Sequence, residues 1–321
     1  MVQTSAQHFC QPGSAGVTSQ QKILPACTWL TAPRRAWGAI VVTVAVVVFG
    51  LLTTGAAFAQ AAPTGSSIER IRAKGELTVA IFSEDVAPFF FTDANGKFVG
   101  VDPSLAEDIA AKLGVRLAYN RAAETFDGLV DEVVDGRADM AISLLSDTLD
   151  RAMRVNFSDS YVSVRQFMLI NRLQLSRLLA ADQAGADDIP RLLNGPTSRI
   201  GVIGGTSYVG FVQEDFPQAQ KVEFEQWSDM LAAVKRGELV ALMYDEIEIG
   251  NWRISDPAGS LELRPYHLAG HPDTIAIAMR QSEPELKNWV DLYLQKIRDS
   301  SFLATTLNTY LYSKDRTLID D

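Results

Sequence analysis

From about residue 66 onward, short runs rich in β-branched residues alternate with segments whose apolar residues recur every three or four positions. The first pattern predicts strands, and the second predicts helices with one buried face. The predicted strands lie at residues 76–82, 115–119 and 138–142, and the predicted helices at residues 103–113 and 129–135. Tandem strand–helix units of this kind predict an α/β fold, in which helices cover both faces of a largely parallel sheet.

Local signals mark the boundaries of two of these elements. Asp102 belongs to the residue types that cap helix N-termini, and Pro103 suits the first helical position. Gly114 is expected to end the same helix. A turn at residues 93–96 predicts a hairpin between two short strands. We therefore expect the Asp102 side chain to bond the first turn of the helix that follows it.

One stretch of the chain is echoed later with the same internal spacing. Residues 124–136 and 225–237 share an aromatic residue, three further apolar positions and a terminal glycine without a gap. The strands predicted before them, at residues 77–82 and 199–203, also correspond. A match at generic helix positions can arise by chance, but the agreement of the flanking strands favours two α/β lobes of like design.

The N-terminus has the pattern of an export signal. Two arginines precede an apolar run at residues 39–52, which is shorter than the roughly 18–20 residues that a membrane-spanning helix needs. Residues 57–59 are Ala-Phe-Ala, the small-residue pattern of a cleavage site. We predict that residues 1–59 form a signal peptide with a long N-terminal region, cleaved after Ala59. An uncleaved signal anchor is the alternative.

Charge and cysteine content narrow the function. The first 59 residues hold three basic residues and no acidic one, so the rest of the chain has 26 basic and 39 acidic residues. A surface this negative repels phosphate backbones, which disfavours nucleic-acid binding. Both cysteines, Cys10 and Cys27, precede the predicted cleavage site, so the exported chain would have no disulfide and no thiolate metal site. Export without disulfides suits a bacterial periplasm, where we expect the protein.

Polar side chains gather just beyond the predicted strands, where two-lobed α/β folds bind their ligands. There the chain carries Arg151, a turn with Gly204 and Gly205, and Asp245. A guanidinium binds a carboxylate through two parallel N–H bonds, and the N–H groups of a glycine turn at a helix start support the same anion. An ionised carboxylate accepts hydrogen bonds from an ammonium group. The set fits a small zwitterion such as an amino acid.

Each of these residues also has a purely structural interpretation. Arg151 could form a surface ion pair with Asp147 or Asp150. Thr148 could cap a short helix, and Asp245 could cap a helix that begins at the next residue. The residues alone do not decide between these interpretations and a ligand site.

At these positions the chain resembles the bacterial periplasmic amino-acid-binding proteins, family 3 of the extracellular solute-binding proteins. The likeness covers about residues 66–312. Its most specific stretch combines Gly-x-x-Asp at residues 136–139, Thr-x-x-Arg at 148–151 and Phe-Ser-x-x-Tyr at 157–161. Two earlier signatures lie at residues 87–89 and 100–106.

The resemblance implies a ligand site without a metal or other cofactor. It implies that Arg151 binds the α-carboxylate of the ligand and that Asp245 binds its α-ammonium group. Phe89 and Phe126 fall at or near aromatic positions that wall the ligand side chain, although Phe89 could also belong to the core. The other implied ligand contacts are Ser146, Thr148, Gly205, Thr206 and Ser207.

The resemblance also implies the fold and the partners. The expected fold is a two-lobed periplasmic binding protein fold of type II, with the ligand cleft between lobes that a two-strand hinge joins. Lobe 1 is expected at residues 66–167 and 270–321, and lobe 2 at residues 168–269. We expect a monomer that captures an amino acid or close analogue and delivers it to the membrane permease of an ABC importer.

Two other functions stay open. Some proteins of this fold are periplasmic dehydratases that act on prephenate or arogenate. Their chemistry needs a general acid or base, and Glu84, Asp85 and Asp147 form no recognisable constellation of that kind, so we expect a binding protein and not an enzyme. The chain could also be a sensor or accessory module that passes its ligand state to a membrane partner.

Overall fold

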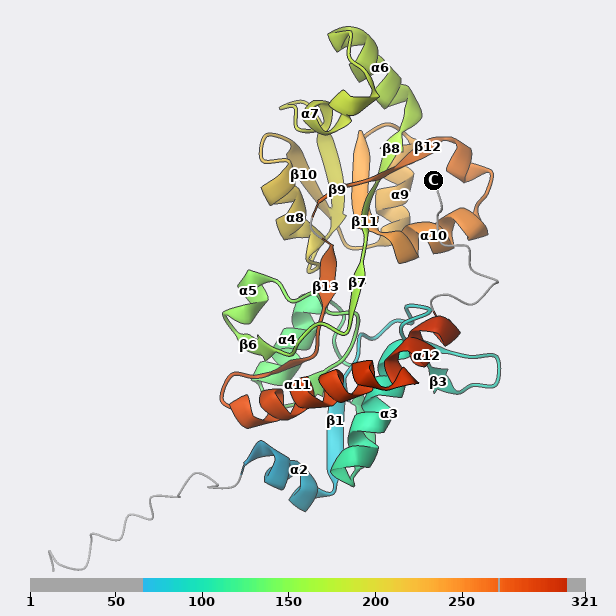
Figure 1. Cartoon of the computed structure of the whole chain (residues 1–321). Coiled ribbons are helices and arrows are strands. Elements are labelled where there is room, and N and C mark those ends of the chain that lie inside the picture. The colour runs from blue at the N-terminus through green and yellow to red at the C-terminus, as the bar shows by residue number, and fades with distance from the viewer. Residues whose placement is uncertain (1–65, 271, 311–321) are drawn as a thin grey trace, which may run out of the picture. The chain divides into compact units, whose positions relative to one another are not determined.

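The computed structural model describes residues 66–270 and 272–310, which form two five-stranded sheets with helices packed against them (Figure 1). The signal-peptide prediction for residues 1–59 lies outside the described residues. No helix within the described ranges is long and apolar enough to cross a membrane.

The first sheet contains the three strands predicted at residues 76–82, 115–119 and 138–142, and it has the order β4-β1-β5-β14-β6. Strands β4, β1 and β5 are parallel, whereas β14 is antiparallel to β5 and β6. Val79 and Met140 pack on one face of this sheet, and Ala80 and Ala141 pack on the other. The strands are β1 (Glu76–Ala80), β4 (Arg116–Asn120), β5 (Met140–Ala141), β6 (Val155–Phe157) and β14 (Ala278–Arg280).

Six helices and a small hairpin accompany the first sheet. The predicted hairpin is present as β2 (Phe91–Thr92) and β3 (Phe98–Val99), which pair antiparallel. The helices are α2 (Ser67–Lys74), α3 (Val101–Leu113), α4 (Phe126–Val134), α5 (Leu149–Ala152), α11 (Pro284–Asp299) and α12 (Ser301–Tyr310).

The prediction that Asp102 caps α3 is wrong. Gly100 precedes this helix with a φ of 136°, and a Cβ there would lie 2.2 Å from the carbonyl oxygen of Phe89, so the close approach requires glycine. Asp102 is fully buried and accepts hydrogen bonds from the Tyr161 hydroxyl (2.7 Å) and the Leu144 N–H (2.8 Å). Asp102 therefore holds the loop after β5 instead of the start of α3.

The second sheet has the order β10-β9-β11-β8-β12. Strands β10, β9 and β11 are parallel, and β8 is antiparallel to β11 and β12. Its strands are β8 (Gln166–Asn171), β9 (Arg199–Ile203), β10 (Gln220–Phe224), β11 (Ala241–Asp245) and β12 (Leu263–His267). Its helical segments are α6 (Arg172–Asp182), η1 (Ala186–Asp188), α7 (Ile189–Leu193), α8 (Tyr208–Asp215), α9 (Trp227–Lys235), α10 (Glu246–Ser255) and η2 (Gly259–Leu261).

The two sheets are built alike. In each one the first strand of the unit (β1 or β9) lies beside the next strand (β4 or β10) at the edge and the third strand (β5 or β11) at the centre, and an antiparallel strand lies beyond the third. The repeated sequence forms α4 and α9, which are both nine residues long and lead to the corresponding strands β5 and β11. The predicted α/β fold with two lobes of like design is confirmed.

The chain passes between the two sheets twice. On the first pass β7 (Val162–Val164) leads into β8, and on the second pass β13 (Asp273–Ile275) follows β12. The two segments pair antiparallel and run side by side between the sheets in Figure 1. This pair corresponds to the expected two-strand hinge. The lobe boundaries at residues 167/168 and 269/270 stay a prediction.

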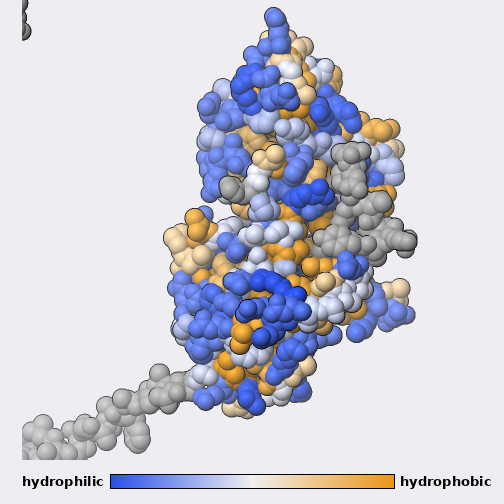
Figure 2. All heavy atoms as spheres, viewed as in Figure 1, coloured by the Kyte–Doolittle hydropathy of each residue, from blue (hydrophilic) through white to orange (hydrophobic). Residues whose placement is uncertain are grey.

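The short helix α5 and the residue after it expose apolar side chains. Figure 2 shows hydrophilic residues over most of the visible surface and hydrophobic residues gathered over α5. Leu149 is 87% exposed and Met153, just after α5, is 72% exposed. The same short helix turns Arg151 inward, where its side chain is buried.

Candidate functional site

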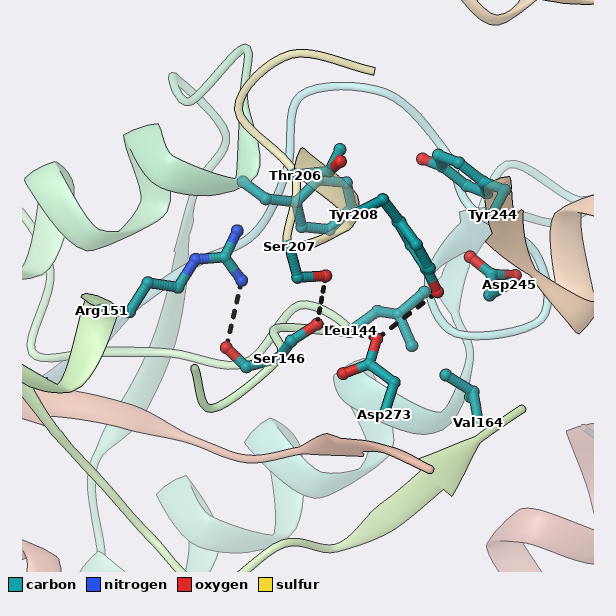
Figure 3. Close-up of a pocket in the computed structure, with 11 residues that line it drawn as sticks. Leu144, Ser146, Arg151, Val164, Thr206, Ser207, Tyr208, Tyr244, Asp245 and Asp273 are labelled. Atoms are coloured by element: carbon teal, nitrogen blue, oxygen red, sulfur yellow. Dashed lines mark hydrogen bonds between the residues drawn. The ribbon is translucent and has the colours of Figure 1, made fainter. Parts of the chain in front are cut away.

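A pocket lies beyond the ends of β5, β9 and β11 and is lined by residues of both sheets (Figure 3). We call it the central pocket. Its lining residues are Phe126, Leu144, Ser146, Arg151, Val164, Thr206, Ser207, Tyr208, Tyr244, Asp245 and Asp273. Of the nine ligand contacts expected from the sequence, the structure brings together six in this pocket. The other three, Thr148, Gly205 and Phe89, lie outside its lining.

Arg151 enters the central pocket from α5 and is only 6% exposed. Its Nε donates to Asp127 Oδ1 (2.9 Å), and its Nη1 donates to the carbonyl oxygen of Ser146 (3.1 Å). The proposed surface pair with Asp147 or Asp150 is therefore wrong. Nη2 is buried and has no hydrogen-bond partner among the described residues. A buried cationic donor without a partner is costly, so this atom is suited to an anionic ligand.

Thr148 contacts the backbone of Arg151. Its side-chain oxygen accepts a hydrogen bond from the backbone N–H of Arg151 (3.3 Å), so Thr148 is the N-cap of α5. Thr148 lines a different cavity, which Arg151 also lines. The structural interpretation of Thr148 as a cap therefore describes its contacts.

Asp245 ends β11 and begins α10, and it is 5% exposed. Its Oδ1 accepts hydrogen bonds from the backbone N–H groups of Ile247 and Glu248, both at 2.8 Å. Burial raises the pKa of Asp245 to about 6, although the two N–H groups act in the opposite direction. Asp245 therefore caps α10 and also places a buried carboxylate in the pocket wall. The two functions are compatible.

Ser146 and Ser207 meet across the central pocket. Ser146 Oγ lies 2.9 Å from Ser207 Oγ and 2.9 Å from Asp273 Oδ2. When Asp273 is ionised its carboxylate only accepts hydrogen bonds, so Ser146 then donates to Asp273 and accepts from Ser207. The free volume of the central pocket is about 20 Å³, which is roughly enough for one water molecule. These hydroxyls therefore close the pocket between the two sheets.

The loop after β9 carries three of the expected contacts. Thr206 and Ser207 line the central pocket just before α8, and their carbonyl oxygens accept from the N–H groups of Val209 (3.4 Å) and Gly210 (3.0 Å) in its first turn. Gly205 instead contacts the first sheet's helix α4, because its carbonyl oxygen accepts from the Asp127 N–H (3.0 Å). A Cβ on Gly205 would lie 2.8 Å from the Cβ of Thr125. Gly205 is thus a contact between the two halves of the described chain.

The two expected aromatic contacts have different environments. Phe126 lines the central pocket and stacks on Phe82, with ring centroids 4.9 Å apart. Phe89 is fully buried in the core beneath α3 and lines none of the described pockets. The prediction that Phe89 walls the ligand is wrong for this reason, and the alternative that it belongs to the core describes it.

Sequence reasoning missed Asp273. This residue begins β13 on the return crossing and reaches the pocket through Ser146, and Tyr208 OH lies 3.5 Å from the same carboxylate oxygen. Burial raises the pKa of Asp273 to about 7. Ligand-binding residues are expected at the ends of the sheet strands. Asp273 lies on a strand that crosses between the sheets, and no sequence pattern marks such a position.

A larger cavity of about 650 Å³ adjoins the central pocket, and we call it the side chamber. It shares Phe126, Leu144, Thr206, Tyr244 and Asp245 with the central pocket. Its further lining residues are Phe82, Ser83, Glu84, Asp85, Val86, Glu124, Thr125, Ile203, Gly204, Phe224, Glu225, Gln226, Trp227 and Glu248.

Two like α/β halves, joined by a pair of crossing strands and separated by a pocket with polar groups from both, define a hinged, two-lobed solute-binding protein. A family model described as bacterial extracellular solute-binding proteins, family 3, matches residues 77–313, and the chain belongs to this family. The family expected from the sequence motifs is confirmed.

Two curated relatives illustrate the range of similar proteins. The lysine/arginine/ornithine-binding periplasmic protein of Escherichia coli (strain K12) is 27% identical over 175 residues, which are 54% of this chain and 62% of that protein. The membrane-bound lytic murein transglycosylase F of Erwinia tasmaniensis is 28% identical over 189 residues, which are 57% of this chain and 35% of that protein. The matches thus span less than two thirds of either relative.

A solved structure matches over a longer stretch. It is that of an ancestral amino acid-binding protein, a precursor of cyclohexadienyl dehydratase, with a TM-score of 0.60 and 26% identity. The match covers 76% of this chain and 99% of that one. The similar proteins therefore include binding proteins and an enzyme, with amino-acid binding named in the full-length structural match.

Proposed function

We propose that the chain is a periplasmic receptor that captures an amino acid or close analogue between its two lobes and delivers it to an ABC importer. Family membership and the amino-acid-binding relatives support this proposal. The observation that carries it is Nη2 of Arg151, a buried cationic donor that has no partner within the described residues and lines the same pocket as the buried Asp245.

In this proposal the two ends of the amino-acid head group bind to opposite lobes. The α-carboxylate accepts from Arg151 Nη2 and from backbone N–H groups at the start of α8 other than those of Val209 and Gly210, which donate to Thr206 and Ser207. The α-ammonium group donates to Asp245. Each charge-assisted hydrogen bond contributes about 1.5–3 kcal/mol, so the set is sufficient for micromolar affinity, about −8 kcal/mol.

The head group would replace the contact between Ser146 and Ser207. These hydroxyls occupy the narrow space between Arg151 and Asp245, and both can bond to a carboxylate or an ammonium group instead. We propose that the lobes, residues 66–167 with 270–321 and residues 168–269, open about the β7–β13 pair to admit the ligand. Ligand-bound closure is favoured because only the closed state lets both lobes contact the ligand.

The remaining features of the proposal follow the export signal and the family. We propose a monomer in the periplasm, released by cleavage after Ala59, with an ABC permease as its membrane partner and no nucleic-acid partner. The net negative charge that follows residue 59 supports the last point.

We propose binding and not catalysis. A dehydratase would need a proton donor or acceptor near the ligand, and besides Asp245 the buried Asp273 with its raised pKa is a group in the pocket that could act in this way. Its contact with Ser146 and its place on the hinge strand favour a structural function. Incubation with prephenate tests this directly: we expect no phenylpyruvate, and its formation would show that the protein is an enzyme.

Titration calorimetry of the purified protein against the twenty amino acids tests the receptor proposal. We expect micromolar or tighter binding of at least one amino acid, with a melting temperature that rises with ligand concentration. The absence of binding by every amino acid, opine and betaine would refute the proposal.

A further inference from the structure

The side chamber lies where the side chain of a bound amino acid would extend. It shares five lining residues with the central pocket, including Asp245, the proposed ammonium site. Its volume of about 650 Å³ falls within the range of small-molecule sites. The central pocket, at about 20 Å³, has no comparable space. The chemistry of the side chamber should therefore decide which side chains are accepted.

The side chamber has an acidic lining, and no lysine or arginine is among the described residues that form it. Asp85 is neutralised by an ion pair with Arg121 at 2.9 Å. Within residues 66–270 and 272–310, no basic side chain forms an ion pair with the other five carboxylates. These are Glu84, Glu124, Glu225, Asp245 and Glu248. A cleft lined by one sign of charge concentrates the opposite charge, so the chamber attracts cations.

Glu248 is the most enclosed of the added acids. It is half-buried on α10, one helical turn after Asp245, and its side-chain carboxylate accepts no hydrogen bond from the described residues. Burial, together with the charge of Asp245, raises the pKa of Glu248 to about 7. Two neighbouring carboxylates without a counter-charge destabilise the empty chamber, and a bound cation would relieve their repulsion.

Aromatic rings form the other part of the wall. Phe126 stacks on Phe82, and Trp227 lies against Tyr244 with ring centroids 5.3 Å apart. The faces of aromatic rings attract guanidinium and ammonium groups. They also pack well against the aliphatic stem of a long basic side chain. Acidic and aromatic walls together favour a cation at the end of an apolar stem.

We propose that the bound amino acid carries a cationic side chain, a guanidinium or ammonium group on an aliphatic stem, and that this group enters the side chamber. The inference rests on the proposed function, because the head group must lie in the central pocket for the side chain to reach the chamber. A neutral side chain would leave Glu248 without a counter-charge, and an anionic side chain would be repelled.

A comparison of matched ligands tests the charge. L-Citrulline has the length and shape of L-arginine but a neutral urea group, and L-norleucine likewise lacks the charge of L-lysine. Calorimetry with the purified protein should show arginine binding about 100-fold tighter than citrulline, and lysine tighter than norleucine. If a neutral or anionic amino acid binds as tightly as arginine and lysine, this inference is refuted while the receptor proposal stands. If no amino acid binds, the receptor proposal fails as well.

A matched pair of variants locates the effect. Glu248→Gln keeps the shape and removes the charge, so the arginine-to-citrulline affinity ratio should fall about tenfold. Asp229→Asn removes an exposed acid of α9 that lies outside the chamber lining, and it should leave the ratio unchanged. Without ligand, Glu248→Gln should melt at the same or a higher temperature, because repulsion from Asp245 is removed, so unfolding does not explain weaker binding. An unchanged ratio in Glu248→Gln combined with Glu84→Gln and Glu225→Gln would refute the assignment.

Discussion

The parallel strands of the two sheets are arranged alike, but the chain carries opposite charges beyond the two central strands, β5 and β11. After β5, a loop leads to the short helix α5, which brings Arg151 into the pocket. After β11, the chain enters α10 at once, and Asp245 lies at that junction. An anion is favoured at a helix N-terminus, where backbone N–H groups point toward it. The guanidinium instead requires acceptors, which Asp127 and the Ser146 carbonyl supply.

Arg151 and Asp245 also differ in how their charges are compensated. Arg151 is compensated in part by Asp127, whereas no cation within the described residues compensates Asp245. Burial accordingly raises the pKa of Asp245 to about 6. A repeated scaffold can therefore present a permanently charged group on one lobe and a titratable group on the other. We expect the sensitivity of ligand binding to pH to arise on the acidic side.

Of the changes considered, removal of the Arg151 guanidinium should weaken ligand binding most. We expect Arg151→Ala to weaken amino-acid binding by about 2–4 kcal/mol, because the ligand carboxylate would be buried without its main partner. Arg154→Ala is the matched control, since Arg154 is exposed and pairs with Asp131 at the surface. Titration calorimetry measures both, and unchanged affinity in Arg151→Ala would show that the carboxylate binds elsewhere.

Asp245→Asn should weaken binding by about 1.5–3 kcal/mol and change its pH dependence. The ammonium group binds the ionised carboxylate, so wild-type affinity should fall as the pH drops through about 6, where Asp245 becomes protonated. Glu248 and Asp273 titrate near pH 7, which makes pH 5–6 the diagnostic range. Affinities measured across this range should be flat in the variant, and a wild-type slope in the variant would contradict the assignment.

Asp273→Asn should affect stability more than binding. Burial raises the pKa of Asp273 from 3.8 to about 7, so between these values the folded state binds a proton more tightly than the unfolded state. The wild-type protein therefore loses stability as the pH rises from about 4 to about 7. We expect the variant to be more stable than wild type by about 1–3 kcal/mol at pH 8 and nearly equal at pH 4. Urea unfolding at both values measures this difference, and a gain that is the same at both would argue against it.

A substitution at the contact between Gly205 and Thr125 should have the smallest effect on ligand binding. Gly205→Ala would place a Cβ 2.8 Å from the Cβ of Thr125, with the backbone at a φ of 72°. Gly96→Ala is the control, because Gly96 has a φ of 78° but open space around it. Both variants should lose about 1 kcal/mol of stability, and Gly205→Ala alone should weaken ligand binding, by about 1 kcal/mol, since it opposes closure. Equal affinities in the two variants would show that this contact does not contribute to closure.

The elements that could be predicted are those with local signals. Strand and helix alternation, and the likeness of the α4 and α9 segments, follow from side-chain periodicity, which the backbone geometry of each element imposes. The start of α4 was predicted three residues too late, because Thr125 caps it through the Gly128 N–H at 2.9 Å. The cap at Asp102 was assigned wrongly, because the close approach of Gly100 to Phe89 is a tertiary feature.

Within the candidate site, Arg151 and Asp245 were predictable because each follows a central strand of a recognisable unit. Asp273 was not, since its distance from Ser146 depends on how β13 crosses between the sheets. Whether Phe89 is a core residue or a wall residue likewise depended on the packing beneath α3. Residue type was informative at strand ends and ambiguous elsewhere.

By itself, the sequence determined the order of strands and helices, the two-lobed family and the two charged residues beyond the central strands, because these depend on neighbours along the chain. Only the tertiary structure decided that Nη2 of Arg151 has no partner among the described residues, that the carboxylate of Asp273 on a hinge strand contacts Ser146, and that acids without an ion pair in the described chain line an adjoining cavity. Those features arise where segments more than a hundred residues apart are brought together by the pairing of β7 and β13, so no local pattern encodes them.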